Sequence, residues 1–115
     1  MRHKLGIKKL SKPTDQRVAL INSIIYSLIK HGKIKLTVTR AKAAKPVAEK
    51  LLSLAKAGDI FSRRKAGKIL KDRDMIKTLF SYAPRLEGRP GGFTRITKIG
   101  YRRGDAAPLG LLEIL

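Results

Sequence analysis

The sequence has no cysteine, no tryptophan and few aromatic or acidic residues. Without cysteine, disulfide bonds, thiolate metal sites and thiol redox motifs are excluded, as is typical of proteins from a reducing compartment. Aromatic residues make up 5% of the chain, so stacking of nucleic-acid bases on an aromatic platform is not expected to be its main binding device. Eight acids stand against 27 lysines and arginines, giving a formal net charge of +19 at pH 7.

That net charge indicates an anionic partner. A chain so basic repels itself unless it is neutralised, most often by nucleic acid and less often by an acidic membrane surface. The most apolar stretch, residues 18–29, is interrupted by Asn22 and two serines and is too short to span a bilayer. It is followed by KHGKIK where a signal peptide would carry a small-residue cleavage site. We therefore interpret it as a buried helix of a soluble, cytoplasmic-type protein without a membrane partner.

The residues needed for catalysis do not cluster along the sequence. His3 and His31 have no second histidine or carboxylate at metal-ligand spacing. Ala66-Gly67-Lys68 is similar to the end of a P-loop, but Ser62 stands where that motif needs glycine, and Ile69 where it needs serine or threonine. Four of the acids stand at expected helix starts, where capping explains them. The sequence therefore predicts no enzyme, no metal, no cofactor and no small-molecule substrate.

Periodicity predicts a basic N-terminal arm over residues 1–12 and a single globular α/β domain over residues 13–115. A first helix begins at Thr14 or Asp15 as N-cap and ends at Gly32. A strand follows over 33–38, then a helix capped by Thr39 and closed by Gly58. Pro46 predicts that this second helix either kinks or begins late.

The second half of the domain is expected to contain two short helices and two strands. The helices cover 60–70 and 73–82, with Asp59 and Asp72 as caps. Residues 85–93 read as an exposed loop. A strand with a possible bulge covers 94–102, and a nearly all-apolar, well-covered strand covers 109–115.

This order, α-β-α-α-α-β-β, is typical of an α+β fold in which helices pack on one face of a small sheet. Strict alternation in KIKLTV places Lys33 and Lys35 on the opposite face of the sheet.

The basic residues are concentrated in blocks that we interpret as phosphate contacts, because cationic side chains bind nucleic-acid backbones by releasing counterions. The candidates are Arg2, Lys4, Lys8, Lys9 and Lys12 in the arm, Arg63 and Arg64 in the middle, and Arg89, Arg95, Lys98, Arg102 and Arg103 in the last third.

Gly91 and Gly92 lie among the last of these blocks. Glycines allow a backbone to approach a bulky ligand, and their N–H groups can bond phosphate oxygens. An ordinary flexible hairpin loop explains the same residues equally well.

Composition is compatible with either RNA or DNA. No helix-turn-helix, zinc-finger or RNA-recognition signature is present, which favours binding by shape and backbone over sequence readout. A DNA-binding architectural protein of the nucleoid is the main alternative. Such proteins often insert apolar wedges into the minor groove, and no exposed apolar tip is expected here. An enzyme acting on nucleic acid lacks visible catalytic groups.

Short motifs recur in one order from the first residue to the last: Met1-Arg2-His3, Lys9-Leu10, Pro13-Thr14, Arg17, Leu51 to Lys56, Arg63-Arg64, Gly91 to Ile96, Arg103 to Pro108, and Glu113-Ile114-Leu115. In this order and spacing they resemble the bacterial large-subunit ribosomal proteins of the L-seventeen family. The resemblance implies a two-layer α/β fold with a three-stranded mixed sheet.

The resemblance also implies a function. The chain would be a structural constituent of the large subunit of cytoplasmic ribosomes, supporting translation. It would bind large-subunit rRNA near the periphery of the polypeptide exit tunnel, beside neighbouring large-subunit proteins. The arm would reach into rRNA, and the Gly91-Gly92 loop would lie near it. On this basis His3, which helps to position the arm, and Arg17 join the candidate RNA contacts.

Overall fold

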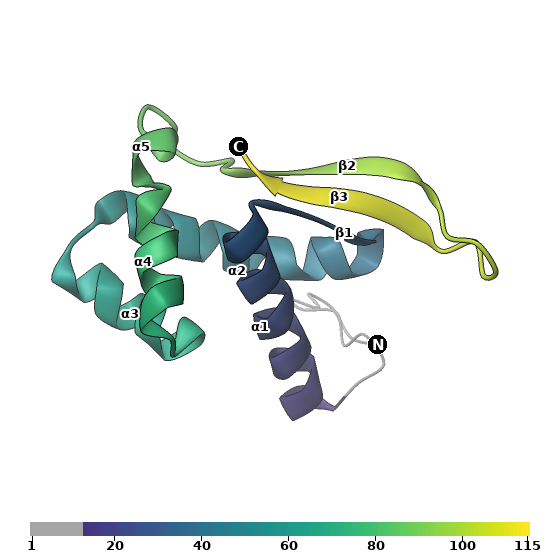
Figure 1. Cartoon of the computed structure of the whole chain (residues 1–115), viewed down its shortest axis with the longest axis horizontal. Coiled ribbons are helices and arrows are strands. Elements are labelled where there is room, and N and C mark those ends of the chain that lie inside the picture. The colour runs from purple at the N-terminus through teal and green to yellow at the C-terminus, as the bar shows by residue number, and fades with distance from the viewer. Residues whose placement is uncertain (1–12) are drawn as a thin grey trace, which may run out of the picture.

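The computed structural model describes residues 13–115. Its helices cover one face of a three-stranded sheet (Figure 1). The elements are α1 (Thr14–His31), β1 (Lys33–Thr37), α2 (Val38–Ala57), α3 (Ile60–Leu70), α4 (Arg73–Ser81), α5 (Ala83–Leu86), β2 (Thr94–Tyr101) and β3 (Pro108–Ile114). The predicted fold class and order are confirmed. The single turn α5, which begins just before Pro84, was not predicted and overlaps the first two residues of the predicted loop 85–93.

The strand order is β1-β3-β2, and both pairs are antiparallel. The mixed sheet implied by the family resemblance is therefore wrong in this one respect. β1 and β2 do run in the same direction, but β3 lies between them, so no parallel pair forms. The central place of β3 explains its apolar sequence, because a central strand has neighbours on both edges and helices over one face.

Alternation along the strands separates the two faces of the sheet. Leu112 and Ile114 of β3 are buried under the helices. Gly110 lies on the same face, where a Cβ would come within 3.2 Å of Val38 on α2. Lys33 and Lys35 of β1 are exposed on the opposite face, as predicted, since their neighbours in the strand point toward the helices.

The core joins α1, α2, α4 and the sheet. The apolar stripe of α1, which includes Ile25 and Leu28, packs with the buried residues of α2. Two tyrosines tie the helices together through their hydroxyls. Tyr26 donates to the carbonyl of Leu70 (2.6 Å) and Tyr82 to that of Ile29 (2.8 Å).

The predicted N-caps of α3 and α4 are confirmed, and so are the predicted ends of α1 and α2 at Gly32 and Gly58, but the N-caps predicted for α1 and α2 are wrong. Asp59 accepts the N–H of Ser62 (2.7 Å), and Asp72 accepts that of Asp74 (2.9 Å). α1 instead begins after Pro13, and neither Thr14 nor Asp15 caps it. α2 begins at Val38, with Thr37 rather than Thr39 at its N-cap.

Burial explains the early start of α2. Val38 continues the apolar alternation of β1, but its side chain is buried as the first residue of the helix. The late start considered for α2 is therefore wrong, and Pro46 lies inside the helix on an exposed position. The bulge expected in the penultimate strand is confirmed by a register shift between Lys98 and Gly100.

Two residues of the predicted loop 85–93 are buried. Leu86 and Phe93 are both buried, and they anchor the intervening residues at either end. Among the helices within residues 13–115, none combines the length and apolar character that crossing a bilayer would require.

Candidate nucleic-acid interface

The candidate contacts of the basic arm, Arg2, His3, Lys4, Lys8, Lys9 and Lys12, lie outside the described residues. The remaining candidates come from four places in the fold: α1, α3, the loop before β2, and the β2–β3 hairpin. Arg17 is partly exposed in the first turns of α1.

Arg63 and Arg64 are held on α3. The side chain of Asp59 caps this helix, and both arginines are exposed one turn later. The guanidinium of Arg63 lies 4.7 Å from the centre of the Phe80 ring. Stacking on an aromatic face holds the planar group in place while its N–H edges stay available for an anion.

The segment after the two glycines is fixed by Glu49 of α2. One carboxylate oxygen accepts the N–H of Phe93 (3.0 Å), and the other accepts the N–H (2.9 Å) and hydroxyl (2.6 Å) of Thr94. Burial alone would raise the pKa of Glu49, but these hydrogen bonds outweigh it and hold the pKa below the ordinary value of 4.5. Lys56, also on α2, donates to the carbonyl of Arg89. Residues two turns apart on α2 thus position both ends of the loop 89–93, hereafter called the glycine loop.

The two glycines have different reasons to be glycine. Gly92 has a φ of +64°, a left-handed conformation that side chains rarely adopt. Gly91 has no positive φ, and a Cβ built on it would meet no atom within 4 Å. Packing within the described residues therefore gives no reason for a missing side chain at Gly91. Close approach of a ligand does give one.

We predict that Glu49→Gln lowers the free energy of unfolding by about 1–3 kcal/mol at pH 7, since it leaves buried donors poorly paired. Because folding lowers the pKa of Glu49, its carboxylate stabilises the fold fully at pH values above its pKa in the unfolded chain. This stabilisation is lost as the pH falls through its lower pKa in the folded protein. The deficit should therefore shrink below about pH 4.5. Urea unfolding at several pH values measures it, with the exposed Glu87→Gln as control. A deficit that does not change with pH would contradict the assignment.

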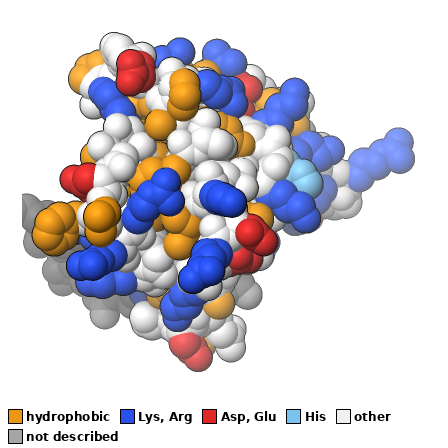
Figure 2. Space-filling model, turned by 60° about the vertical axis from the view of Figure 1, so that its left-hand side comes forward, with side chains coloured by type: hydrophobic (Ala, Val, Ile, Leu, Met, Phe, Trp, Pro, Cys, Tyr) orange, Lys and Arg blue, Asp and Glu red, His pale blue; other side chains and the backbone are white. Residues whose placement is uncertain are grey.

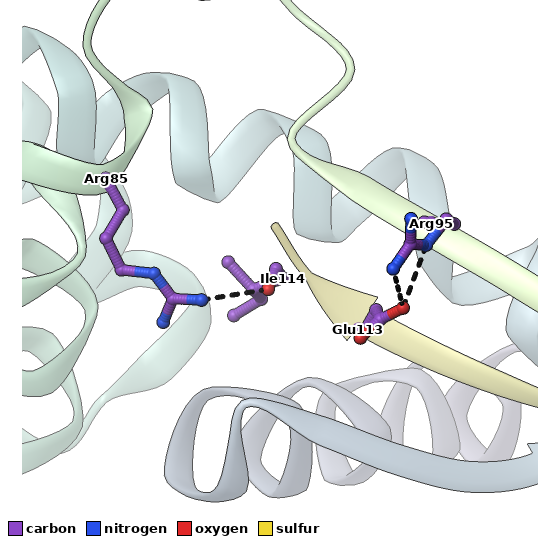
Figure 3. Close-up of polar contacts among 4 residues, drawn as sticks. All are labelled: Arg85, Arg95, Glu113 and Ile114. Carbon is purple, nitrogen blue, oxygen red and sulfur yellow. Dashed lines mark hydrogen bonds and ion pairs between the residues drawn. The ribbon is translucent and has the colours of Figure 1, made fainter.

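Two candidate arginines of the β2–β3 hairpin already have carboxylate partners. Arg95 donates twice to one oxygen of Glu113 on β3 (2.8 and 2.6 Å), which Figure 3 shows. Arg102 donates to both oxygens of Asp105 across the hairpin turn (3.1 and 2.5 Å). The hydrogen bond from Arg102 lowers the pKa of Asp105 to about 2. Both arginines remain more than half exposed, so each pair orients a guanidinium at the surface without burying it.

Arg85, a basic residue near the candidate contacts, has a structural role. It donates to the carbonyl of Ile114 (3.2 Å) at the end of β3, also shown in Figure 3, and stacks 5.3 Å from the ring centre of Tyr82.

Sequence reasoning missed Lys50 as part of a basic surface, although Lys65 and Lys68 belong to the same basic block as Arg63 and Arg64. Lys50 of α2 and Lys65 and Lys68 of α3 surround a hollow of about 330 Å³. The spacing of Lys65 and Lys68 places them on one side of α3, but only the packing of α3 on α2 brings Lys50 beside them. Figure 2 turns the α3–α4 side of Figure 1 forward and shows basic side chains spread over this face with few acids among them.

The described candidates do not form one cluster. α3 and the β2–β3 turn lie toward opposite ends of the long axis (Figure 1). Ile60 and Phe61, at the start of α3, are 67% and 72% exposed. The expectation of no exposed apolar tip is therefore wrong, and this criterion does not distinguish an RNA-binding protein from a nucleoid protein. Among residues 13–115, no three His, Asp or Glu side chains come together as metal ligands.

Comparison with known proteins resolves the family. Residues 20–115 match the sequence model of the family described as ribosomal protein L17. A large ribosomal subunit protein bL17 from Dictyoglomus thermophilum is 47% identical over the full length of both chains. The bL17 protein of Myxococcus xanthus is 43% identical over all of this chain and 84% of its own length. That of Clostridium acetobutylicum is 46% identical over 96% of this chain and 97% of its own.

Proposed function

Because the chain belongs to the ribosomal protein L17 family, we propose that it binds large-subunit rRNA by neutralising phosphates and by fitting the shape of the folded RNA. Membership itself makes it a structural, non-enzymatic constituent of the large subunit of bacterial-type, cytoplasmic ribosomes. In our proposal, its contacts lie near the periphery of the polypeptide exit tunnel, beside neighbouring large-subunit proteins. The resemblance of the motifs supports that location.

The observation that carries the proposal is the use of the acids within the fold. Asp59 and Asp72 cap helices, and Glu49 holds the segment after the glycine loop. Glu113 and Asp105 pair with Arg95 and Arg102. Apart from these two arginines, no lysine or arginine within residues 13–115 forms an ion pair with a carboxylate. Most of the positive charge is therefore available to an external polyanion.

The wide spread of the candidates supports binding by backbone and shape. A protein that reads base edges concentrates a few side chains on one groove-filling element, whereas phosphate contacts distribute over a broad surface. Here the described candidates extend from α3 to the β2–β3 hairpin. Gly91 contributes a backbone that a phosphate can approach closely.

We expect the tagged wild-type protein to migrate with large subunits on a sucrose gradient after a high-salt wash, and Gly91→Val to be depleted from them. The added side chain would block hydrogen bonds to a charged phosphate, each worth about 1.5–3 kcal/mol, or at least tenfold in affinity. Crosslinking in the recovered subunits would then test the contacts with rRNA at the outer end of the exit tunnel. Migration with DNA, or release into light fractions, would contradict the proposal.

Gly92→Ala is the matched control. It forces a side chain into a left-handed conformation, so it should lower the stability of the isolated protein by about 1–2 kcal/mol. Gly91→Val should leave the thermal midpoint of the isolated protein unchanged. If both variants unfold at the same lowered temperature, Gly91 is a turn residue and its proposed contact is wrong.

A further inference from the structure

The β2–β3 hairpin carries an exposed aromatic side chain that the proposed phosphate contacts do not use. Tyr101, the last residue of β2, is 75% exposed. The other two tyrosines differ, because Tyr26 and Tyr82 are partly buried and donate their hydroxyls to backbone carbonyls. Tyr101 pairs with Pro108 of β3, while β1 ends at Thr37 opposite Leu109. The Tyr101–Pro108 pair therefore lies beyond the end of β1.

The bulge determines which way this residue faces. In β2, Thr94, Ile96 and Lys98 pair with Ile114, Leu112 and Gly110 on the helix side of the sheet. The register shift then inserts Ile99, so that Gly100 pairs with Leu109 and Tyr101 with Pro108. The inserted residue brings Tyr101 to the same face as Lys98, where plain alternation would have put it on the other.

The surroundings of Tyr101 are cationic. Lys98 and Arg103 are exposed on either side of it along the chain, and neither is ion-paired with a carboxylate of the described residues. Arg102 is held by Asp105, and the N–H of Ala107 donates to the same carboxylate (3.2 Å). The turn is thus braced by its own polar contacts. A flat ring beside free cations, on a braced support, suits a nucleotide, whose phosphate and base are bound by different groups.

We propose that Tyr101 stacks on an unpaired base of the bound RNA while Lys98 and Arg103 hold the adjoining phosphates. This inference rests on the proposed function and adds the class of nucleotide bound by the hairpin. A paired base offers its faces only to its neighbours in the stack, so the contact selects a loop, bulge or strand end. One such ring is consistent with the low aromatic content, since it is a single stacking position and not a platform.

Two probes test the contact: a short RNA hairpin with a single-stranded loop, and a blunt RNA duplex with the same number of phosphates. Tyr101→Ala should weaken binding of the looped RNA by about 5- to 150-fold, the range found for stacking aromatics, and leave duplex binding unchanged. Tyr101→Phe should bind both like the wild type. Because no phosphate contact is removed, Tyr101→Ala should not alter the slope of affinity against salt, whereas Arg103→Gln should reduce it.

Tyrosine fluorescence provides a second readout, because the chain has no tryptophan. The looped RNA should quench wild-type emission. It should not quench Tyr101→Phe, which retains the stacking ring but not the responding fluorophore. Equal affinity of Tyr101→Ala and the wild type for the looped RNA, or equal loss on both RNAs, would overturn the inference. Failure of the wild type to bind either RNA, together with its absence from large subunits, would instead refute the proposed function.

Discussion

The affinity of the isolated protein for large-subunit rRNA is expected to fall by roughly 10³–10⁵ between 50 and 200 mM salt if six to ten phosphates are contacted. The reason is counterion release: each cation that replaces a condensed counterion adds about 0.7–0.9 to the slope of log affinity against log salt. Few lysines and arginines of residues 13–115 are paired with carboxylates, so many are available for such exchange. Filter binding or fluorescence anisotropy across a salt series measures the slope.

The lysines around the α2–α3 hollow provide the sharpest form of this experiment. Replacing Lys50, Lys65 and Lys68 together by glutamine should reduce the slope by about two to three, if each contacts a phosphate. The same positions changed to arginine keep the charge and should keep the slope. A flat salt dependence of the wild type would contradict binding dominated by the RNA backbone. An unchanged slope in the glutamine variant would show that this hollow faces away from the RNA.

Local signals predicted the helices of the middle of the chain well. α3 spans the predicted residues because Asp59 is a strong N-cap and its apolar residues recur at helical spacing. The start of α2 was misplaced because Val38 fits two patterns equally: the last apolar position of a strand and the first buried position of a helix. Contact with the sheet decides between them, since Val38 packs against Gly110 of β3. That contact spans most of the sequence, and no local window contains it.

For the candidate interface, too, local properties could be predicted from the sequence and contacts between distant segments could not. Charge and residue type can be read from the sequence, so Arg63, Arg64 and Arg103 were predicted as candidate contacts, and the structure shows that they are exposed. The ion-pair partners of these residues cannot be read from the sequence. Nothing in the spacing shows that Glu113 reaches Arg95, because the two meet only when β2 pairs with β3. The hollow around Lys50 is likewise a product of helix packing.

Two phenylalanines show most clearly that burial cannot be predicted from local sequence alone. Phe61 follows a helix cap beside apolar Ile60, while Phe93 follows two glycines in a stretch that reads as an exposed loop. Phe61 is 72% exposed, whereas Phe93 is only 1% exposed, although the stretch 85–93 was predicted to be an exposed loop. The cause is α2, where Glu49 binds the backbone of Phe93 and Lys56 lies 5.9 Å from the centre of its ring. The carbonyl of Phe93 also accepts the N–H of Leu115 (2.9 Å).

Phe93→Ala should therefore lower the free energy of unfolding by about 3–5 kcal/mol, the cost of emptying a buried aromatic site. Phe61→Ala, the same change at an exposed position, should stay within about 0.5 kcal/mol of the wild type. Urea unfolding monitored by circular dichroism compares the two. Equal losses would mean that Phe93 is no anchor. The predicted difference would mean that the buried ring of Phe93 anchors the C-terminal end of the glycine loop to the core.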